Sequence, residues 1–174
     1  MELSEKELEN HIFNDLIENG GSNLNERGLS LPFFQLDVNP KWYKQLNIDP
    51  YGIIDIAGFY RYAGQIRVDL LELKKVSVDA NHIEQIFRYR KGLEVYLANT
   101  FKGNISIRVN CIIIGSSNDG LYTQNYSPVD IASYEIDLIN GINFEYTHYA
   151  SGWHIKTNEK KSFRKPKTNG QKVY

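Results

Sequence analysis

The sequence contains a single cysteine, Cys111, which excludes an internal disulfide bond. One buried thiol suits a reducing compartment, because disulfides are rare in the cytosol. No apolar run approaches the roughly 20 residues that a membrane-spanning helix needs. The N-terminus is acidic and lacks the apolar segment of a signal peptide. We therefore expect a cytoplasmic protein with no membrane partner.

Several common chemical sites are also missing. The four histidines do not have the spacing of a zinc site, and one cysteine cannot complete such a site. There is neither a glycine-rich phosphate loop nor a G-x-S-x-G nucleophile motif. The net charge is −1, so the chain as a whole does not indicate nucleic-acid binding.

The basic residues are unevenly distributed, which divides the chain in two. Residues 156–174 hold seven Lys and Arg against the single Glu159. The rest has a composition that can fill one sizeable core, since 41% of all residues are hydrophobic. The sequence predicts a single domain over residues 1–155 and a basic, flexible tail over 156–174. The tail either holds DNA through its cations or only keeps the chain soluble.

The stretch 53–75 carries charged residues within two apolar runs, where a strand would normally keep hydrophobic residues alone. The second run alternates, which places Glu72 and Lys74 on one face of a strand. Residues 62–65 predict a tight turn that sets Asp55 directly opposite Glu72. Opposed Cβ atoms lie about 4.5–5.5 Å apart. Two carboxylates that close repel unless a proton or a hard cation such as Mg²⁺ lies between them.

A first helix is expected from Ser4 to Asn19, with Ser4 as its N-cap and Glu7 in the capping-box position. Its expected buried residues are Leu8, Ile12, Phe13, Leu16 and Ile17. Glu9 lies at the edge of this apolar face. It is either a solvated residue or directed into a functional site.

A second helix is expected within Val76 to Asn99, with Asp79 or Asn81 as its N-cap. Its expected core residues are Ile83, Ile86, Phe87, Leu93 and Leu97. Gln85 and Tyr89 are four residues apart and therefore adjacent on one helix face. Alone, they form an ordinary polar helix edge.

The basic face of this helix includes Arg88 and Lys91, and Lys75 lies in the loop before it. These cations suit a phosphate backbone, although a solvated helix face has the same composition. They are the candidate nucleic-acid-binding residues.

The remaining segments predict further strands and one helix. Residues 31–38 are expected to form the first strand, with Pro32 at its start. Trp42 and Tyr43 are core or lid residues, or stack on an unpaired base. Residues 105–115 predict a buried strand that contains Cys111 as a small hydrophobic residue.

The segment 127–139 carries a helix-start signal, a serine followed by a proline and an early acid. We expect a helix there, ended by Asn140-Gly141. The alternative is a hairpin that pairs Leu138 with Ile142 and Ile136 with Phe144. Residues 142–149 alternate and predict a strand.

Asp55, followed after sixteen residues by Glu72-Leu73-Lys74, resembles the D…(D/E)-x-K signature of the PD-(D/E)XK, restriction-endonuclease-like nuclease superfamily. The proline of that name is absent. Gln85 and Tyr89 resemble the Q-x-x-x-Y motif of the branch that includes NucS-type and RecB-type nucleases, and S-E-K-E-L-E around Glu9 resembles the first helix of NucS-type endonucleases. The resemblance covers about residues 5 to 115.

The resemblance implies an α/β fold with an αβββαβ core, in which helices flank a central mixed sheet. It implies one or two Mg²⁺ or Mn²⁺ ions, held by Asp55, Glu72 and the carbonyl of Leu73. Lys74 would orient the attacking water or take its proton, with a pKa lowered by the metal and by burial.

In the same family pattern Gln85 and Tyr89 position water and phosphate, and Glu9 joins the metal site. The implied activity is hydrolysis of phosphodiester bonds in DNA, with RNA left open and a homodimer possible. The alternatives are a catalytically silent module that binds DNA or protein, and a structural ion pair between Lys74 and one carboxylate.

Overall fold

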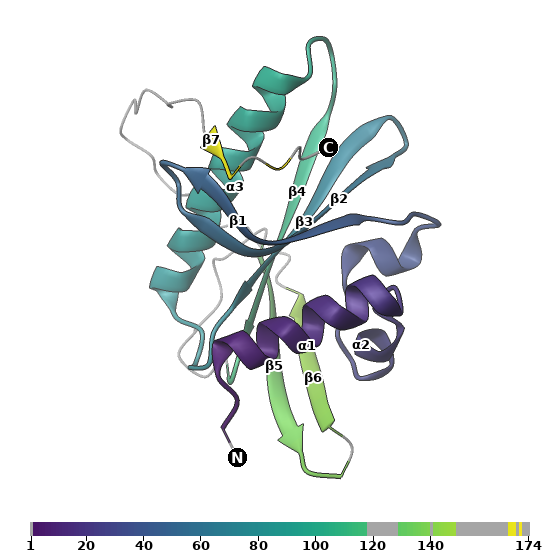
Figure 1. The fold of residues 1–174 in the computed structure, drawn as a ribbon, viewed down its shortest axis with the longest axis vertical. Helices are drawn as coiled ribbons and strands as arrows, with labels where there is room; N and C mark the ends of the chain where they lie inside the picture. Colours follow the sequence, from purple (N-terminus) through teal and green to yellow (C-terminus); the bar gives the residue numbers. More distant parts are fainter. Residues whose placement is uncertain (1, 118–128, 140, 149–166, 170, 172–174) are drawn as a thin grey trace.

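The structure is a computed structural model that describes residues 2–117, 129–139, 141–148, 167–169 and 171 (Figure 1). Its helical elements are α1 (Glu5–Glu18), α2 (Ser22–Glu26), the 3₁₀ helix η1 (Pro32–Gln35) and α3 (Ala80–Thr100). Its strands are β1 (Lys41–Asp49), β2 (Ile53–Tyr62), β3 (Gln65–Leu73), β4 (Ile107–Gly115), β5 (Val129–Asp137), β6 (Gly141–His148) and β7 (Lys167–Thr168). Within the described part of the chain, no helix combines the length and apolar character needed to cross a membrane.

The strands form one mixed sheet in the order β6-β5-β4-β3-β2-β1-β7. β1, β2 and β3 run antiparallel, β3, β4 and β5 run parallel, and β6 returns antiparallel to β5. Helix α3 covers one face of the sheet, and α1 with α2 and η1 covers the other (Figure 1). The chain order α1, β1, β2, β3, α3, β4 is the αβββαβ order that the sequence predicted, so the predicted fold class is confirmed.

Strand β3 shows why the sheet needs helices on both faces. Ile66, Val68 and Leu70 belong to the core under α3, whereas Leu71 and Leu73 belong to the core under α1. Because both faces are covered, the apolar residues of β3 are buried on either side, and its two acids, Asp69 and Glu72, are buried with them. The predicted alternation in this strand is confirmed, and Glu72 therefore falls on the face that α3 covers.

The predicted first helix is confirmed, including the capping box between Ser4 and Glu7. Its apolar stripe is narrower than predicted, because Ile17 is 57% exposed. Asp15 occupies the buried position instead. It accepts hydrogen bonds from the side chains of Asn19 and Asn23 and from the backbone of Leu24, which joins α1 to α2.

The predicted strand over residues 31–38 is wrong, since η1 occupies this segment. Pro32 favours the first turn of a helix at least as well as the start of a strand. The first strand is β1, which contains the aromatic pair. Tyr43 is a core residue, and Trp42 packs against Phe33 and over Gly58, where an added Cβ would lie 2.5 Å from the indole ring.

The predicted helix over residues 127–139 is also wrong, because residues 129–137 form β5. Val129 and Ile131 are fully buried, and β5 pairs with the edge of β4, so tertiary pairing overrides the local signal. The residues that carried the helix-start signal, 127 and 128, lie outside the described residues. β5 and β6 form the alternative hairpin in a shifted register, with Ile136 opposite Ile142.

In the predicted basic tail, Lys167 and Thr168 form β7, which pairs with the end of β1. The predicted boundary at residue 155 and the flexibility of the tail stay predictions. Most of the other residues of the tail lie outside the described residues.

Asp69 links η1 to the sheet. Its fully buried carboxylate accepts hydrogen bonds from the Tyr60 hydroxyl (3.0 Å), the Asn110 amide (2.7 Å) and the Phe33 backbone amide (3.3 Å). Burial raises the pKa of Asp69 to about 6, although the three donors favour the charged form.

We expect this raised pKa to make the protein more stable in mild acid. A carboxyl group whose pKa is higher in the folded state binds its proton more tightly there, so the free energy of unfolding falls as pH rises from about 4 to 6. The expected fall is about 3 kcal/mol. Urea denaturation between pH 4 and 7 measures it, and Asp69→Asn is the control. An unchanged pH slope in this variant would contradict the assignment.

Candidate metal-dependent active site

The predicted turn between β2 and β3 fixes the position of the two central carboxylates. Ala63 and Gly64 both have positive φ, as a two-residue type I′ turn requires. The register runs from Tyr62 opposite Gln65 to Ile56 opposite Leu71. Asp55 and Glu72 lie just beyond the last paired residues, and the charge of Asp55 acts on Glu72, so the two carboxylates are near one another. Their direct pairing across the strands stays a prediction.

The side-chain alternation of two strands reverses at this point. Ile54 packs on the α3 side of the sheet but Ile56 packs on the α1 side, although a regular strand would direct both to one face. On β1, Tyr43 and Leu46 both pack on the α3 side. Between them Gln45 has φ = +50°, a left-handed conformation. Such irregularities re-aim side chains, and here they accompany the turn of Asp55 towards α1.

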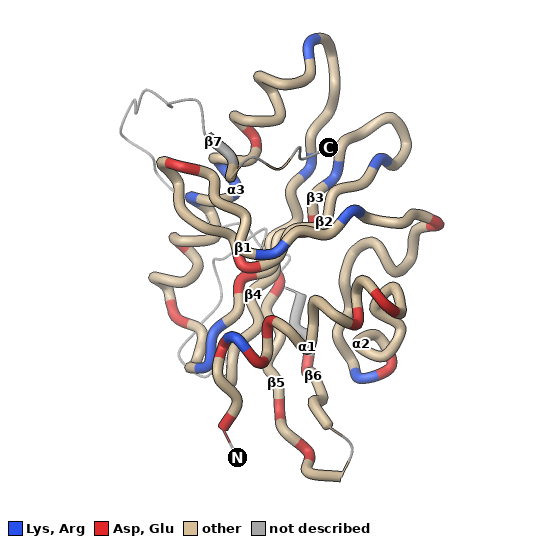
Figure 2. Tube along the Cα trace, viewed as in Figure 1, with Lys and Arg blue, Asp and Glu red and all other residues tan. Residues whose placement is uncertain are grey.

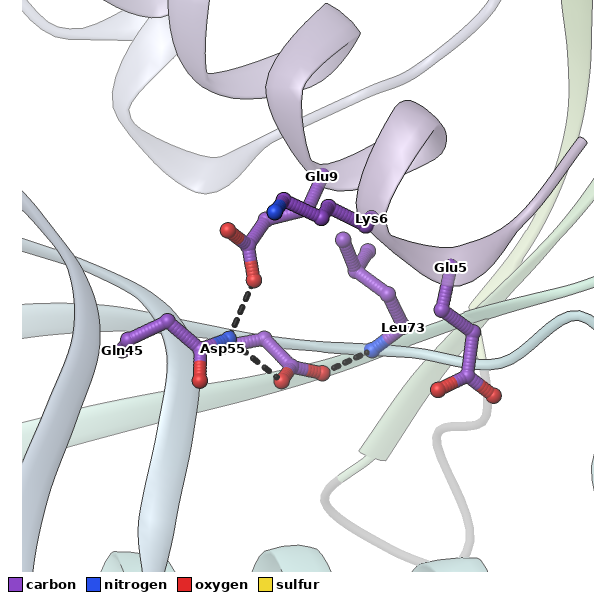
Figure 3. A pocket seen from close by; sticks show the side chains of 6 residues that line it. All are labelled: Glu5, Lys6, Glu9, Gln45, Asp55 and Leu73. Atoms are coloured by element: carbon purple, nitrogen blue, oxygen red, sulfur yellow. Dashed lines mark hydrogen bonds between the residues drawn. The ribbon is translucent and has the colours of Figure 1, made fainter.

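A cavity of about 500 Å³ lies between α1 and the ends of β1, β2 and β3. It is lined by Glu5, Lys6, Glu9, Gln45, Asp55 and Leu73 (Figure 3). The Gln45 amide donates a hydrogen bond to Glu9 and a second one, of 3.4 Å, to Asp55. The Leu73 backbone amide donates to the other oxygen of Asp55 at 2.8 Å. Glu9 is 7% exposed, so it is directed into the cavity rather than into bulk solvent.

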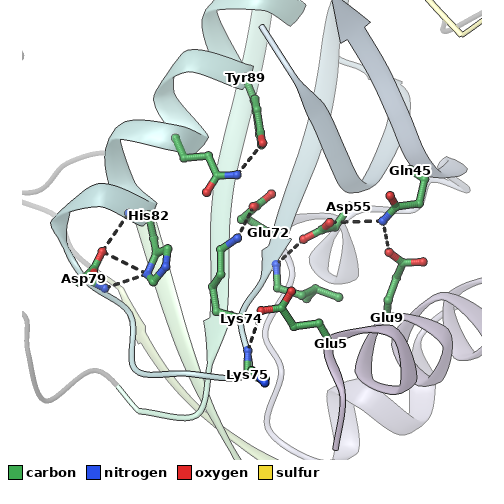
Figure 4. Close-up of polar contacts among 12 residues, drawn as sticks. Glu5, Glu9, Gln45, Asp55, Glu72, Lys74, Lys75, Asp79, His82 and Tyr89 are labelled. Atoms are coloured by element: carbon green, nitrogen blue, oxygen red, sulfur yellow. Dashed lines mark hydrogen bonds and ion pairs between the residues drawn. The ribbon is translucent and has the colours of Figure 1, made fainter.

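Glu72 is a buried carboxylate with an incomplete set of partners. Lys74 Nζ lies 2.8 Å from its Oε1 (Figure 4). Its Oε2 is buried and has no hydrogen-bond partner among the described residues. Burial, together with the nearby charge of Asp55, raises the pKa of Glu72 to about 7. Burial also raises the pKa of Asp55, against the hydrogen bond from Leu73. Glu72 is therefore only partly ionised at neutral pH, and a further positive charge beside it would favour its ionised form.

The pKa of Lys74 differs from the expectation that the metal and burial lower it. Burial alone would lower its pKa, but the Glu72 and Asp55 carboxylates outweigh burial and raise it. Among the protein's own groups, Lys74 is therefore held as an ammonium ion. It can act as a base only when a cation offsets the two carboxylates.

Gln85 and Tyr89 interact with each other rather than with the carboxylates. The Gln85 amide donates to the Tyr89 hydroxyl at 2.5 Å, and Tyr89 packs against Gly52. Both side chains come from α3, the helix on the face that Glu72 shares, and Figure 4 shows Tyr89 on this helix. No hydrogen bond in the described part of the chain joins this pair to Asp55 or Glu72, so its role stays a prediction.

The three candidate nucleic-acid-binding residues lie outside the lining of the cavity. The Lys75 backbone amide donates to Glu5 at 3.2 Å, which leaves the lysine side chain exposed at the edge of the site. Arg88 donates to the Tyr51 carbonyl at 3.0 Å and so supports the loop before β2. Lys91 lies on the exposed face of α3. Their contact with nucleic acid stays a prediction.

The donors present suit a hard cation better than zinc. Within the described residues, no three His, Cys, Asp or Glu side chains are grouped closely enough to hold a metal by themselves. Mg²⁺, however, is usually bound by one or two carboxylates and completed by water and substrate phosphates. The buried, unpartnered Oε2 of Glu72 is an acceptor of the required kind. By ligand type, the carboxylates of Asp55 and Glu72 therefore suit Mg²⁺ or Mn²⁺, and the Leu73 carbonyl stays a predicted third ligand.

Sequence reasoning missed three residues that line the cavity, Gln45, Glu5 and Lys6. Glu5 has a detectable signal, since it lies four residues before Glu9 and therefore on the same helix face. Gln45 has none, because its left-handed backbone breaks the alternation by which a strand is recognised.

Gln45 can be tested by two substitutions. A left-handed residue with a Cβ is strained, so we expect Gln45→Gly to be more stable than Gln45→Ala by about 1 kcal/mol. Both variants lose the amide that bridges Glu9 and Asp55, so the difference between them isolates the backbone conformation. Urea denaturation measures the difference in stability. Equal stability of the two variants would argue against the left-handed backbone.

No protein-family model and no curated protein matches the chain. Among solved structures, it is similar to a repair endonuclease from Pyrococcus abyssi, with 24% identity and a TM-score of 0.39. The match covers 68% of this chain and 40% of that protein, so the chain spans less than half of its length. The assignment of a function rests on the residues of the site.

Proposed function

We propose that this protein is a metal-dependent nuclease of the PD-(D/E)XK type that hydrolyses phosphodiester bonds in DNA. The observation that supports the proposal is the buried carboxylate of Glu72, whose Oε2 has no hydrogen-bond partner among the described residues and which lies near a second, partly buried carboxylate, Asp55. A buried carboxylate beside a like charge is costly, and an ion pair between Lys74 and Oε1 alone leaves Oε2 without a partner among the described residues. A divalent cation satisfies both groups.

Asp55, Glu72 and the Leu73 carbonyl would hold the cation. When bound, the cation supplies Lewis-acid stabilisation of the charge that develops on the phosphate. Lys74, held 2.8 Å from Glu72, orients a water molecule or takes its proton once its neighbouring carboxylates are neutralised.

The cavity wall has a positioning role. Gln45 bridges Glu9 and Asp55, and the Leu73 amide fixes the other oxygen of Asp55. These contacts hold the carboxylate in one orientation, which is what preorganisation of a catalytic site requires.

The test is cleavage of end-labelled single-stranded and duplex DNA, with labelled RNA in parallel. We expect products with Mg²⁺ or Mn²⁺, and none with EDTA or with Glu72→Gln. Products that persist in EDTA would contradict a metal-dependent mechanism. DNA binding without cleavage under any metal would favour the catalytically silent module.

A further inference from the structure

A second cavity, of about 270 Å³, lies at the opposite end of strand β2 from Asp55. Arg61 borders this cavity and follows Asp55 by six positions, or about 20 Å along the strand. The residues that line the cavity are Asn39, Lys41, Phe59, Tyr60, Arg61, Ile66 and Phe101. None of them lines the cavity beside α1, so the two sites are separate.

The floor of this cavity is apolar and its rim is cationic. Phe59 and Ile66 are 2% and 3% exposed and form part of the core. Phe101, at the end of α3, is partly exposed, and the Arg61 guanidinium lies 5.5 Å from the centre of its ring. Lys41 is exposed, directly across from Phe59 in the sheet. Aromatic and apolar surface beneath cations is the combination that binds a nucleobase together with its phosphate.

The positive charge at this end of the sheet is not neutralised within the described chain. Neither Lys41 nor Arg61 forms an ion pair with a described carboxylate. Figure 2 shows further Lys and Arg segments in blue towards this end of the sheet. Arg67 and Arg108, neighbours on β3 and β4, alternate onto the other face of the sheet and are not part of the rim. Asp69 is nearby, but it is buried and bound by three donors. An anion approaching the rim therefore meets an attractive field.

The C-terminus of α3 lies beside the cavity and opposes this field. Helix C-termini carry partial negative charge on their free carbonyls. The Arg61 guanidinium, 5.5 Å from the ring of Phe101 at this terminus, places a full positive charge beside it.

From this juxtaposition we propose that the second cavity binds one nucleotide, with the base against Phe101 and the apolar floor and the phosphate between Lys41 and Arg61. Its volume lies near the lower end of small-molecule sites, about 300 Å³, and suits a single nucleotide rather than a duplex. The nucleotide is either a free mononucleotide or one unit of a single strand. The site does not depend on the proposed catalysis.

Binding is measured by calorimetry on the whole chain in EDTA, with dAMP and with a six-residue single-stranded oligonucleotide. The test variant is Lys41→Gln/Arg61→Gln, whose two positions are exposed. We expect it to weaken binding at least about tenfold, since hydrogen bonds to charged groups are among the stronger ones. Arg27→Gln, a cation lost near α2, should change binding less than twofold.

Comparing ligands distinguishes a mononucleotide site from a site for one unit of a single strand, and it tests the contribution of the base. Tight dAMP binding identifies a mononucleotide site, whereas binding of the oligonucleotide alone identifies a strand unit. Deoxyribose 5-phosphate should bind about tenfold more weakly than dAMP, because base stacking is lost. The proposal is overturned if neither nucleotide binds, if Arg27→Gln weakens binding as much as the double variant, or if a hexaglutamate peptide binds as well as the nucleotides.

A further variant tests nucleotide binding at the second cavity independently of the proposed nuclease activity. Glu72→Gln should bind nucleotide at the second cavity as tightly as the wild type while losing cleavage. Loss of both in this variant would contradict two separate sites. Retained cleavage with no nucleotide binding in the wild type would overturn the second cavity alone.

Discussion

Replacing Glu72 by glutamine should abolish cleavage without lowering the free energy of unfolding. A bound metal supplies several kcal/mol of transition-state stabilisation, and each 1.36 kcal/mol is tenfold in rate, so the expected loss is on the order of a thousandfold. Stability should be unchanged or higher, because the substitution removes a buried charge with one unsatisfied oxygen and keeps its shape. Single-turnover cleavage and urea denaturation measure the two effects.

The matched control is Glu94→Gln on α3. Glu94 also forms an ion pair, at 2.8 Å from Arg90, but 30% of its side chain is exposed. This variant should keep full cleavage and lose less than about 1 kcal/mol of stability. If Glu72→Gln cleaves as fast as the wild type, Glu72 is not part of the catalytic site. If it is strongly destabilised, its carboxylate has a structural role.

Replacing Lys74 by methionine should have the opposite effect on stability. Methionine keeps most of the side-chain volume but removes the ammonium ion that Glu72 contacts at 2.8 Å. The buried carboxylate is then left without a cation, and we expect a loss of about 2–3 kcal/mol at neutral pH together with the loss of cleavage.

The double variant Glu72→Gln/Lys74→Met shows whether the loss of stability in Lys74→Met comes from the uncompensated carboxylate of Glu72. With no carboxylate left to compensate, it should be more stable than Lys74→Met alone. A non-additive recovery of this kind measures the coupling between the two groups. If the changes in the free energy of unfolding of the two single variants simply add up in the double variant, the Lys74–Glu72 contact does not contribute to stability.

The centre of the fold was predictable because several local signals agreed there. The capping box of α1, the period-2 pattern of β3 and the two-residue turn at Ala63-Gly64 each have one simple structural solution. Together they predicted that Asp55 and Glu72 lie near one another on neighbouring strands. The turn of Asp55 towards α1 could not be predicted in this way, because it depends on the reversed alternation between Ile54 and Ile56.

The errors occurred where tertiary contacts override local preference. Pro32 starts a 3₁₀ helix that Asp69 holds through the Phe33 amide, and Asp69 lies 36 residues further along the chain. Val129 to Asp137 has a helix-start signal just before it, yet it completes the sheet beside β4. Neither Asp69 nor β4 lies close enough in sequence to the segment it contacts for a local pattern to reveal the contact.

The candidate site was predicted only in part for a similar reason. Glu9 was left between a solvated and a functional role, because the sequence does not reveal which element faces α1. Gln45 joins Glu9 to Asp55 only because its backbone is left-handed. A strained conformation at a candidate site has no sequence pattern of its own.

The most direct test of the account is the thermal stability of the wild type and of Glu72→Gln as Mn²⁺ is added. A cation that binds only the folded state stabilises it by about 2.7 kcal/mol at a concentration one hundred times its Kd. In a chain of this length that corresponds to a rise in Tm of roughly 5–10 °C. We predict this rise in the wild type and its absence in Glu72→Gln. An equal rise in both proteins, or none in the wild type, would contradict a cation site at Asp55 and Glu72.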